Sequence, residues 1–89
     1  MPVISSFYGL IIYMYYLDNK QHKFPHIHVK YQEFEAVFKI PDGDVLDGEL
    51  PIGKAKLVSA WIELHKDELM ADWQLASNGQ AIFTIEPLK

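Results

Sequence analysis

Three of the four histidines in this chain lie within seven residues, in the segment His22-Lys23-Phe24-Pro25-His26-Ile27-His28. If the residues after Pro25 form a strand, His26 and His28 lie on the same face of it, because side chains two positions apart in a strand point the same way. Two imidazoles at this spacing can bind one divalent metal, and a turn at Pro25 would bring His22 round as a third ligand. The pattern therefore predicts a metal site made by His22, His26 and His28, and a divalent metal is the cofactor that it indicates.

The same segment is suited to general acid–base catalysis without a metal. Histidine titrates closest to neutral pH, so His26 and His28 are also candidate catalytic residues for moving the proton of a water or a ribose hydroxyl. A simpler interpretation is that both histidines occupy the outward positions of a solvated strand. No carboxylate lies within the segment, and the sequence leaves all three interpretations open.

The fourth histidine, His65, falls in the middle of a helical apolar stripe, one turn after Trp61. A histidine in such a place is typically a core residue that makes one hydrogen bond, and Glu68 is three residues further on, within reach to orient it. A role in binding requires the fold to bring His65 close to the other histidines. His65 is therefore a candidate binding residue, as is His22.

Tyr13 and Tyr15 are candidate binding residues of another kind, because their rings offer faces for stacking. The chain has eight Lys, no Arg and twelve acidic residues, with a formal net charge of −4. The electrostatic part of a nucleic-acid site is therefore missing. Nucleic acid is a disfavoured partner, and the composition favours a place in the core or in a protein interface for these tyrosines.

The composition is typical of a single folded domain, which we expect to span residues 1–89. Hydrophobic residues make up 49% of the chain and charged residues 22%. A chain of this length can bury one modest core. Cysteine is absent, which excludes disulfides and thiolate metal sites.

The apolar run of residues 7–17 is the one segment that resembles a membrane or targeting element. As a helix it would rise about 16 Å, which is too short for a hydrocarbon core of about 30 Å. A signal peptide requires basic residues before its apolar segment, and none precedes this run. We expect a cytoplasmic protein with no membrane contact, in which this run forms a strand covered on both faces.

Residues 26–40 are typical of a β-hairpin whose two apolar faces meet one core. The alternation predicts that Tyr31 pairs with Ala36 and that Val29 pairs with Phe38. The loop is then either Glu33-Phe34 or residues 32–35. The same register places His28 opposite Lys39.

The second half of the chain is typical of helix. Apolar residues follow helical spacing from residue 52 to residue 76, as one long amphipathic helix or two collinear pieces. A short strand is expected near Val45, Asn78-Gly79 is expected to end the helix, and residues 81–86 could add a final edge strand. The fold class is α+β: an antiparallel three- to four-stranded sheet at the N-terminal side, with the helix packed on one face.

Several motifs of the chain resemble the small prokaryotic family catalogued as domain of unknown function 4160. They are Met1-Pro2-Val3-Ile4, Phe7-Tyr8-Gly9, Pro25-His26-Ile27-His28-Val29, Gly48-Glu49-Leu50-Pro51, Trp61-Ile62-Glu63-Leu64-His65, Glu68-Leu69 and Asp72-Trp73. Members typically carry a His, two prolines and His-aromatic-His, whereas here Phe24 replaces the first proline and Ile27 the aromatic residue. The resemblance implies no catalytic residues.

The family is often labelled as transcriptional regulators, and its genes tend to lie beside another small gene, which resembles a toxin–antitoxin pair. We therefore expect a small cytoplasmic protein-interaction or regulatory module of such a two-gene unit. Its partner would be the neighbouring gene's protein or a second copy in a homodimer, because one helix cannot cover both faces of a sheet. The alternative is a ribonuclease-like toxin or small metal-dependent enzyme that uses His22, His26 and His28.

Overall fold

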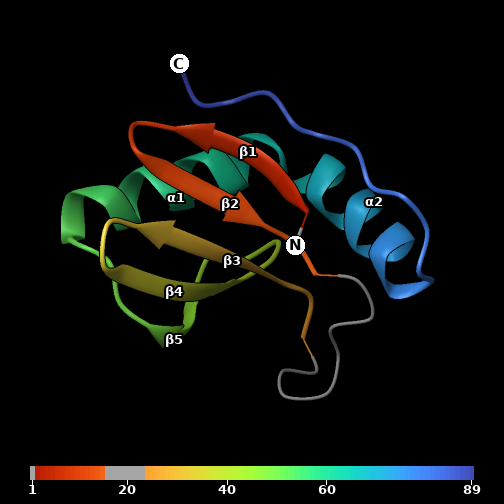
Figure 1. Ribbon diagram of the computed structural model, residues 1–89, viewed down its shortest axis with the longest axis horizontal. Helices are drawn as coiled ribbons and strands as arrows, with labels where there is room; N and C mark the ends of the chain where they lie inside the picture. Colours follow the sequence, from red (N-terminus) through yellow and green to blue (C-terminus); the bar gives the residue numbers. More distant parts are fainter. Residues whose placement is uncertain (1, 16–23) are drawn as a thin grey trace.

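The protein is built on an antiparallel sheet in which each strand pairs with the next along the chain (Figure 1). The computed structural model describes residues 2–15 and 24–89. The strands are β1 (Val3–Phe7), β2 (Leu10–Tyr13), β3 (His26–Tyr31), β4 (Phe34–Lys39) and β5 (Val45–Gly48), in the order β1-β2-β3-β4-β5, and the helices are α1 (Ile52–Leu64) and α2 (Lys66–Ser77). The α+β class is confirmed, but the described residues form five strands, not three or four.

The additional strand is β1, which lies almost entirely before the apolar run of residues 7–17, and that run was wrongly predicted to be one continuous strand. β1 ends at Phe7 and β2 begins at Leu10. Tyr8 and Gly9 between them both have positive φ, 50° and 80°, as in the two-residue hairpin turns that match the twist of a sheet. The chain therefore folds back at the start of the run, so that β2 pairs with β1, while Leu17 and the residues beside it lie outside the described part of the chain.

The β3–β4 hairpin has a two-residue loop that lies one position earlier than the predicted Glu33-Phe34. Val29 pairs with Ala36 and Tyr31 with Phe34, so the predicted register is wrong by two residues. The loop is Gln32-Glu33, and Gln32 has a positive φ of 54°. A displacement of two residues leaves every side chain on its predicted face, which is why the alternation of buried and exposed positions still holds.

The single long helix is also a wrong prediction, because the chain leaves the helical conformation at His65. Its φ of −122° and ψ of 23° separate α1 from α2, and the two helix axes are inclined to each other in Figure 1. The alternative of two pieces is therefore correct, although the pieces are not collinear. The predicted stop at Asn78-Gly79 is confirmed by the positive φ of Gly79, 71°.

The C-terminal residues 80–89 form no strand, contrary to the edge strand that residues 81–86 were expected to make. They run beside the edge strand β1, and the amide of Ile85 donates to the carbonyl of Ile4 over 2.7 Å. One such bond does not make a ladder. The strand near Val45 is confirmed as β5.

One face of the sheet forms the core, and the other is open as far as the described residues 2–15 and 24–89 show. Ile12, Ile27 and Phe38 point from the sheet toward the helices and pack with Trp61 and Ile62, all of them fully buried. Both helices lie on that side (Figure 1). Among the described residues, no helix or strand covers the opposite face. No helix in the described part of the chain is both long and apolar enough to cross a membrane.

Candidate functional site

The open face of the sheet carries a row of side chains that crosses all five strands. The pairing of the strands places Val3 beside Tyr13, Tyr13 beside His28, His28 beside Val37, and Val37 beside Asp47. Residues paired across strands point to the same face and lie close together. In this row the aromatic ring of Tyr13 and the imidazole of His28 lie between the two valines, and the carboxylate of Asp47 stands at one end.

This face is hollowed around the row, with a cavity of about 270 Å³. Its lining comes from four strands and the residues next to them: Tyr13, Tyr15, His28, Val29, Lys30, Glu35, Ala36, Val37, Asp47 and Gly48. Lys30 and Glu35 are paired across β3 and β4 and form an ion pair of 3.9 Å at the rim. The pair is exposed and balances its own charge, so it contributes little to stability. The hollow is of a size to hold one large side chain or a small ligand.

His28 is the residue of the histidine segment that lines this hollow. Its ring lies 4.4 Å from the ring of Tyr15, edge to face at 83°, and its side chain is half-buried. Its cross-strand neighbour is Val37, so the predicted pairing of His28 with Lys39 is wrong. An accessible imidazole among aromatic rings is suited both to binding and to proton transfer.

His26 stands in a different environment although it lies on the same strand. It is only 1% exposed, so the interpretation of both histidines as solvated is wrong for this one. Its Nδ1–H donates to the carbonyl of Phe24 over 2.7 Å, and because a carbonyl only accepts, this nitrogen carries the proton. The ring of Trp73 lies 5.0 Å away. His26 thus orients the start of β3, and its ring is 5.2 Å from that of His28.

The metal site remains a prediction, because His22 lies outside the described residues. Within residues 2–15 and 24–89, no group of three or more metal-ligating side chains is close enough to hold a metal ion. His26 and His28 lie side by side as the sequence indicated. Tyr13 and Tyr15, the two candidate binding tyrosines, line the same hollow as His28.

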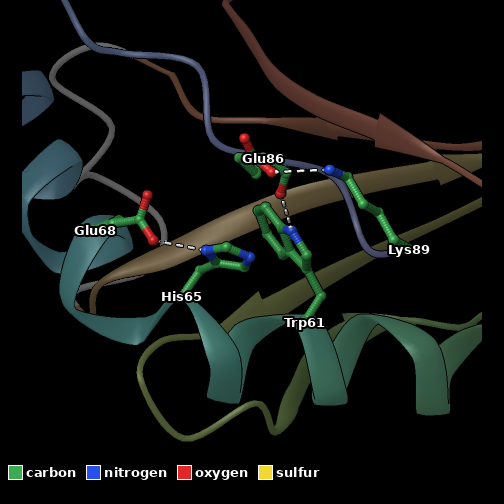
Figure 2. Close-up of polar contacts among 5 residues, drawn as sticks. All are labelled: Trp61, His65, Glu68, Glu86 and Lys89. Atoms are coloured by element: carbon green, nitrogen blue, oxygen red, sulfur yellow. Dashed lines mark hydrogen bonds and ion pairs between the residues drawn. The ribbon is translucent and has the colours of Figure 1, made fainter.

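His65 does not join this site. Figure 2 shows its ring beside Trp61 on the helix side, turned toward Glu68, with 2.6 Å between His65 Nδ1 and Glu68 Oε1. The predicted orienting contact with Glu68 is therefore present. Trp61 next to it donates its indole N–H to the carbonyl of Glu86 over 2.8 Å. His65 follows the last residue of α1 and packs beside Trp61. The centroids of the two rings are 5.6 Å apart.

A buried carboxyl group with a raised pKa, that of Asp72, lies on α2. The carboxylate of Asp72 is 3% exposed, and it accepts a hydrogen bond of 3.0 Å from the amide of Phe83. Burial raises the pKa of Asp72 above its ordinary range, the Phe83 hydrogen bond acts in the opposite direction, and the charge of Glu68 adds to the rise. The helical pattern placed Asp72 near the apolar stripe, where it was a possible partner for His65, whereas in the structure its carboxylate bonds to the amide of Phe83.

Sequence reasoning placed Lys30, Glu35 and Val37 on the outer face of the hairpin, but it named none of them, nor Asp47, as a site residue. The first three alternate with core residues along β3 and β4, so their common face was predictable. Asp47 stands before Gly48 in a pair of residues that is typical of a turn, which gives no sign of a binding site. The missing signal was the register of β5, which pairs Asp47 with Val37.

The arrangement defines a class of small α+β protein: a five-stranded antiparallel meander with two helices on one face and a hollow on the other. The chain belongs to the family described as Domain of unknown function (DUF4160), whose model matches residues 9–74. That span includes β2, the histidine segment and the hollow. Neither a curated protein nor a solved structure matches the chain.

Proposed function

We propose that this protein is a cytoplasmic interaction module of a toxin–antitoxin-like two-gene unit, and that it binds the protein of the neighbouring gene through the open face of its sheet. The observation that carries the proposal is the hollowed face itself. It holds half-buried aromatic and aliphatic side chains, Tyr13, Tyr15 and Val37, on the side away from the helices. A sheet face of this kind gains stability when a second surface removes it from water.

The charges indicate what the partner surface offers. The chain has a formal net charge of −4, which attracts a basic partner over long range and speeds its association. At the face, the ion pair of Lys30 and Glu35 occupies the rim while the centre is aromatic and aliphatic. The proposed partner is therefore a basic protein that presents an apolar side chain to the hollow, with polar groups around it.

Two matched substitutions test this surface. Val37→Asp places a charge in the hollow, and Ile52→Asp places the same charge on α1, at a side chain that is 78% exposed. Both variants carry the same net charge, so a difference in their affinity for the partner comes from the position of the added charge. Co-purification with the neighbouring gene's product, followed by calorimetry, is expected to show binding for wild type and for Ile52→Asp and a loss of at least tenfold for Val37→Asp. Equal affinity of the two variants, or separate elution of the two wild-type proteins at micromolar concentration, contradicts the proposal.

A second candidate function, catalysis by His28, is supported by the position of its imidazole in the hollow next to Tyr15. In this proposal His28 transfers the proton, as in a ribonuclease-like toxin, while the buried His26 positions it through their ring contact. Expression of the wild type should arrest growth and degrade RNA, and His28→Ala should remove both effects with the fold intact. A wild-type protein with no effect on growth or RNA speaks against this candidate and leaves the interaction proposal untouched.

A further inference from the structure

The C-terminal segment, residues 80–89, lies in a groove made by β1, α1 and α2. In Figure 1 it leaves the end of α2 and passes along the outer side of β1. Three hydrogen bonds hold it. Ile85 N donates to Ile4 O over 2.7 Å, Trp61 Nε1 to Glu86 O over 2.8 Å, and Phe83 N to Asp72 Oδ1 over 3.0 Å. Each bond therefore joins the segment to a different wall of the groove.

The groove also selects side chains. Ile85 is 5% exposed, and Ile82 and Leu88 are half-buried against the same core. Phe83, between two of them, is 71% exposed. The segment thus inserts an aliphatic side chain at every third residue, and the groove is a binding site for an extended peptide with that spacing.

Among the described residues, two buried side-chain oxygens lack a hydrogen bond, Ser5 Oγ and Asp72 Oδ2. Ser5 follows the residue that bonds to Ile85, and Asp72 bonds to Phe83 through its other oxygen. A buried polar atom without a partner lowers the stability of the folded state. Release of the segment would return the Asp72 carboxyl, which bonds to Phe83, to water, and this offsets part of the free energy needed to open the segment.

The connection to α2 allows such release. α2 ends at Ser77, and Gly79 follows with a φ of 71° and open space around its Cα, since a Cβ there would meet nothing within 4 Å. A change of backbone conformation at this single residue redirects the segment and withdraws Ile85 from the core, which leaves an apolar surface for another segment to cover. Short hinges of this kind are where proteins exchange identical elements between copies.

We propose that residues 80–89 are an exchangeable segment and that the groove binds the same segment of a second copy of the chain, giving a dimer by reciprocal exchange. The occupant is specified by the groove's own contacts, because a second copy supplies the same aliphatic spacing and the same carbonyl for Trp61. At low protein concentration the monomer is favoured, because tethering gives the segment an effective concentration of about 1 mM at the groove of its own chain. This inference does not rest on the proposed function, because the groove shares no residue with the hollow.

The hinge provides the test. Proline cannot adopt the positive φ of Gly79, so Gly79→Pro prevents the segment from folding back, whereas Gly79→Asn tolerates the conformation. By light scattering at about 100 µM, we expect Gly79→Pro to be a dimer and both Gly79→Asn and wild type to be monomers. The indole N–H resonance of Trp61 should keep its wild-type position in the dimer, because Glu86 of the second copy accepts its hydrogen bond. Adding Ile85→Asp to Gly79→Pro should return a monomer.

A monomeric Gly79→Pro variant with an unchanged Trp61 resonance overturns the proposal, as does a dimer that survives Ile85→Asp. If Gly79→Pro does not fold, the groove is tested in trans with the full chain carrying Ile85→Asp. A synthetic peptide of residues 80–89 should bind this chain and restore the Trp61 resonance, and the same peptide carrying Ile85→Asp should not. Absence of binding by the wild-type peptide at millimolar concentration also overturns the proposal.

Discussion

The rings of His26 and His28 lie 5.2 Å apart on one strand, yet His26 is buried and hydrogen-bonded to a carbonyl whereas His28 faces the hollow. The two positions should therefore respond differently to substitution. His26→Ala leaves the carbonyl of Phe24 without its donor and opens a cavity beside Trp73, and we expect a loss of about 2–3 kcal/mol in the free energy of unfolding. His28→Ala should cost less than about 1 kcal/mol.

Urea denaturation of both variants measures this difference, and the same samples can be assayed for partner binding. His28→Ala should weaken binding while keeping the fold. This result would distinguish His28, as a binding residue, from His26, as a structural one. Equal losses of stability at the two positions would show that His28 is as structural as His26.

Two glycine positions should give opposite results. A Cβ on Gly48 would lie 2.2 Å from the carbonyl oxygen of Glu35, at a φ of 73°, so Gly48→Ala forces β5 away from β4 and should cost about 2–4 kcal/mol. Gly53 lies near the start of α1 with nothing within 4 Å, so Gly53→Ala should stabilise the protein by about 0.5 kcal/mol. Thermal unfolding followed by circular dichroism compares the pair, and a neutral Gly48→Ala would contradict the tight β4–β5 approach.

The buried carboxyl of Asp72 predicts a pH dependence. Burial raises its pKa in the folded protein above the ordinary value of 3.8, so folding favours the protonated form. The stability that this group contributes is fully present below pH 3.8 and is lost as the pH rises through the folded pKa. Asp72→Asn cannot ionise, so its stability relative to wild type should increase from pH 4 to pH 7, by about 1.4 kcal/mol for each pH unit between the two pKa values.

Asp67→Asn is the control for this titration. Asp67 is exposed in the first turn of the same helix, where a negative charge interacts favourably with the helix dipole. Its replacement should lower stability slightly at neutral pH, which is the opposite sign. Urea midpoints measured at several pH values distinguish the two variants, and parallel curves for Asp72→Asn and wild type would refute the raised pKa.

The β3–β4 loop should be open to stabilisation. Gln32 adopts a φ of 54°, a conformation that costs a residue with a Cβ about 1 kcal/mol and glycine almost nothing. Gln32→Gly should therefore raise the free energy of unfolding by up to about 1 kcal/mol. Glu33→Gly, at the neighbouring loop position without a positive φ, should lower it, and chemical denaturation of both variants tests the assignment.

Much of the sheet was predictable because strand alternation is a local property. Ile27 and Val29 alternate with His28 and Lys30 in the sequence, and any pairing that buries the aliphatic pair must leave the other two on the opposite face. This is why the shared face of the hairpin was predicted correctly even though its register was wrong by two residues. The family was likewise readable from short motifs, and the match over residues 9–74 confirms it.

The register, the helix break and the hollow required the tertiary structure. The sequence does not state that Tyr8, Gly9 and Gln32 adopt positive φ, and the turns that contain them decide which strand faces which. Burial of His26 follows from the approach of Trp73, 47 positions away in the chain. Sequence alone determined the residue types on each face of the sheet, since alternation is set by backbone geometry. Only the packing of distant segments decided that Tyr13, His28, Val37 and Asp47 lie in one row, because cross-strand neighbours are set by the turns that join the strands.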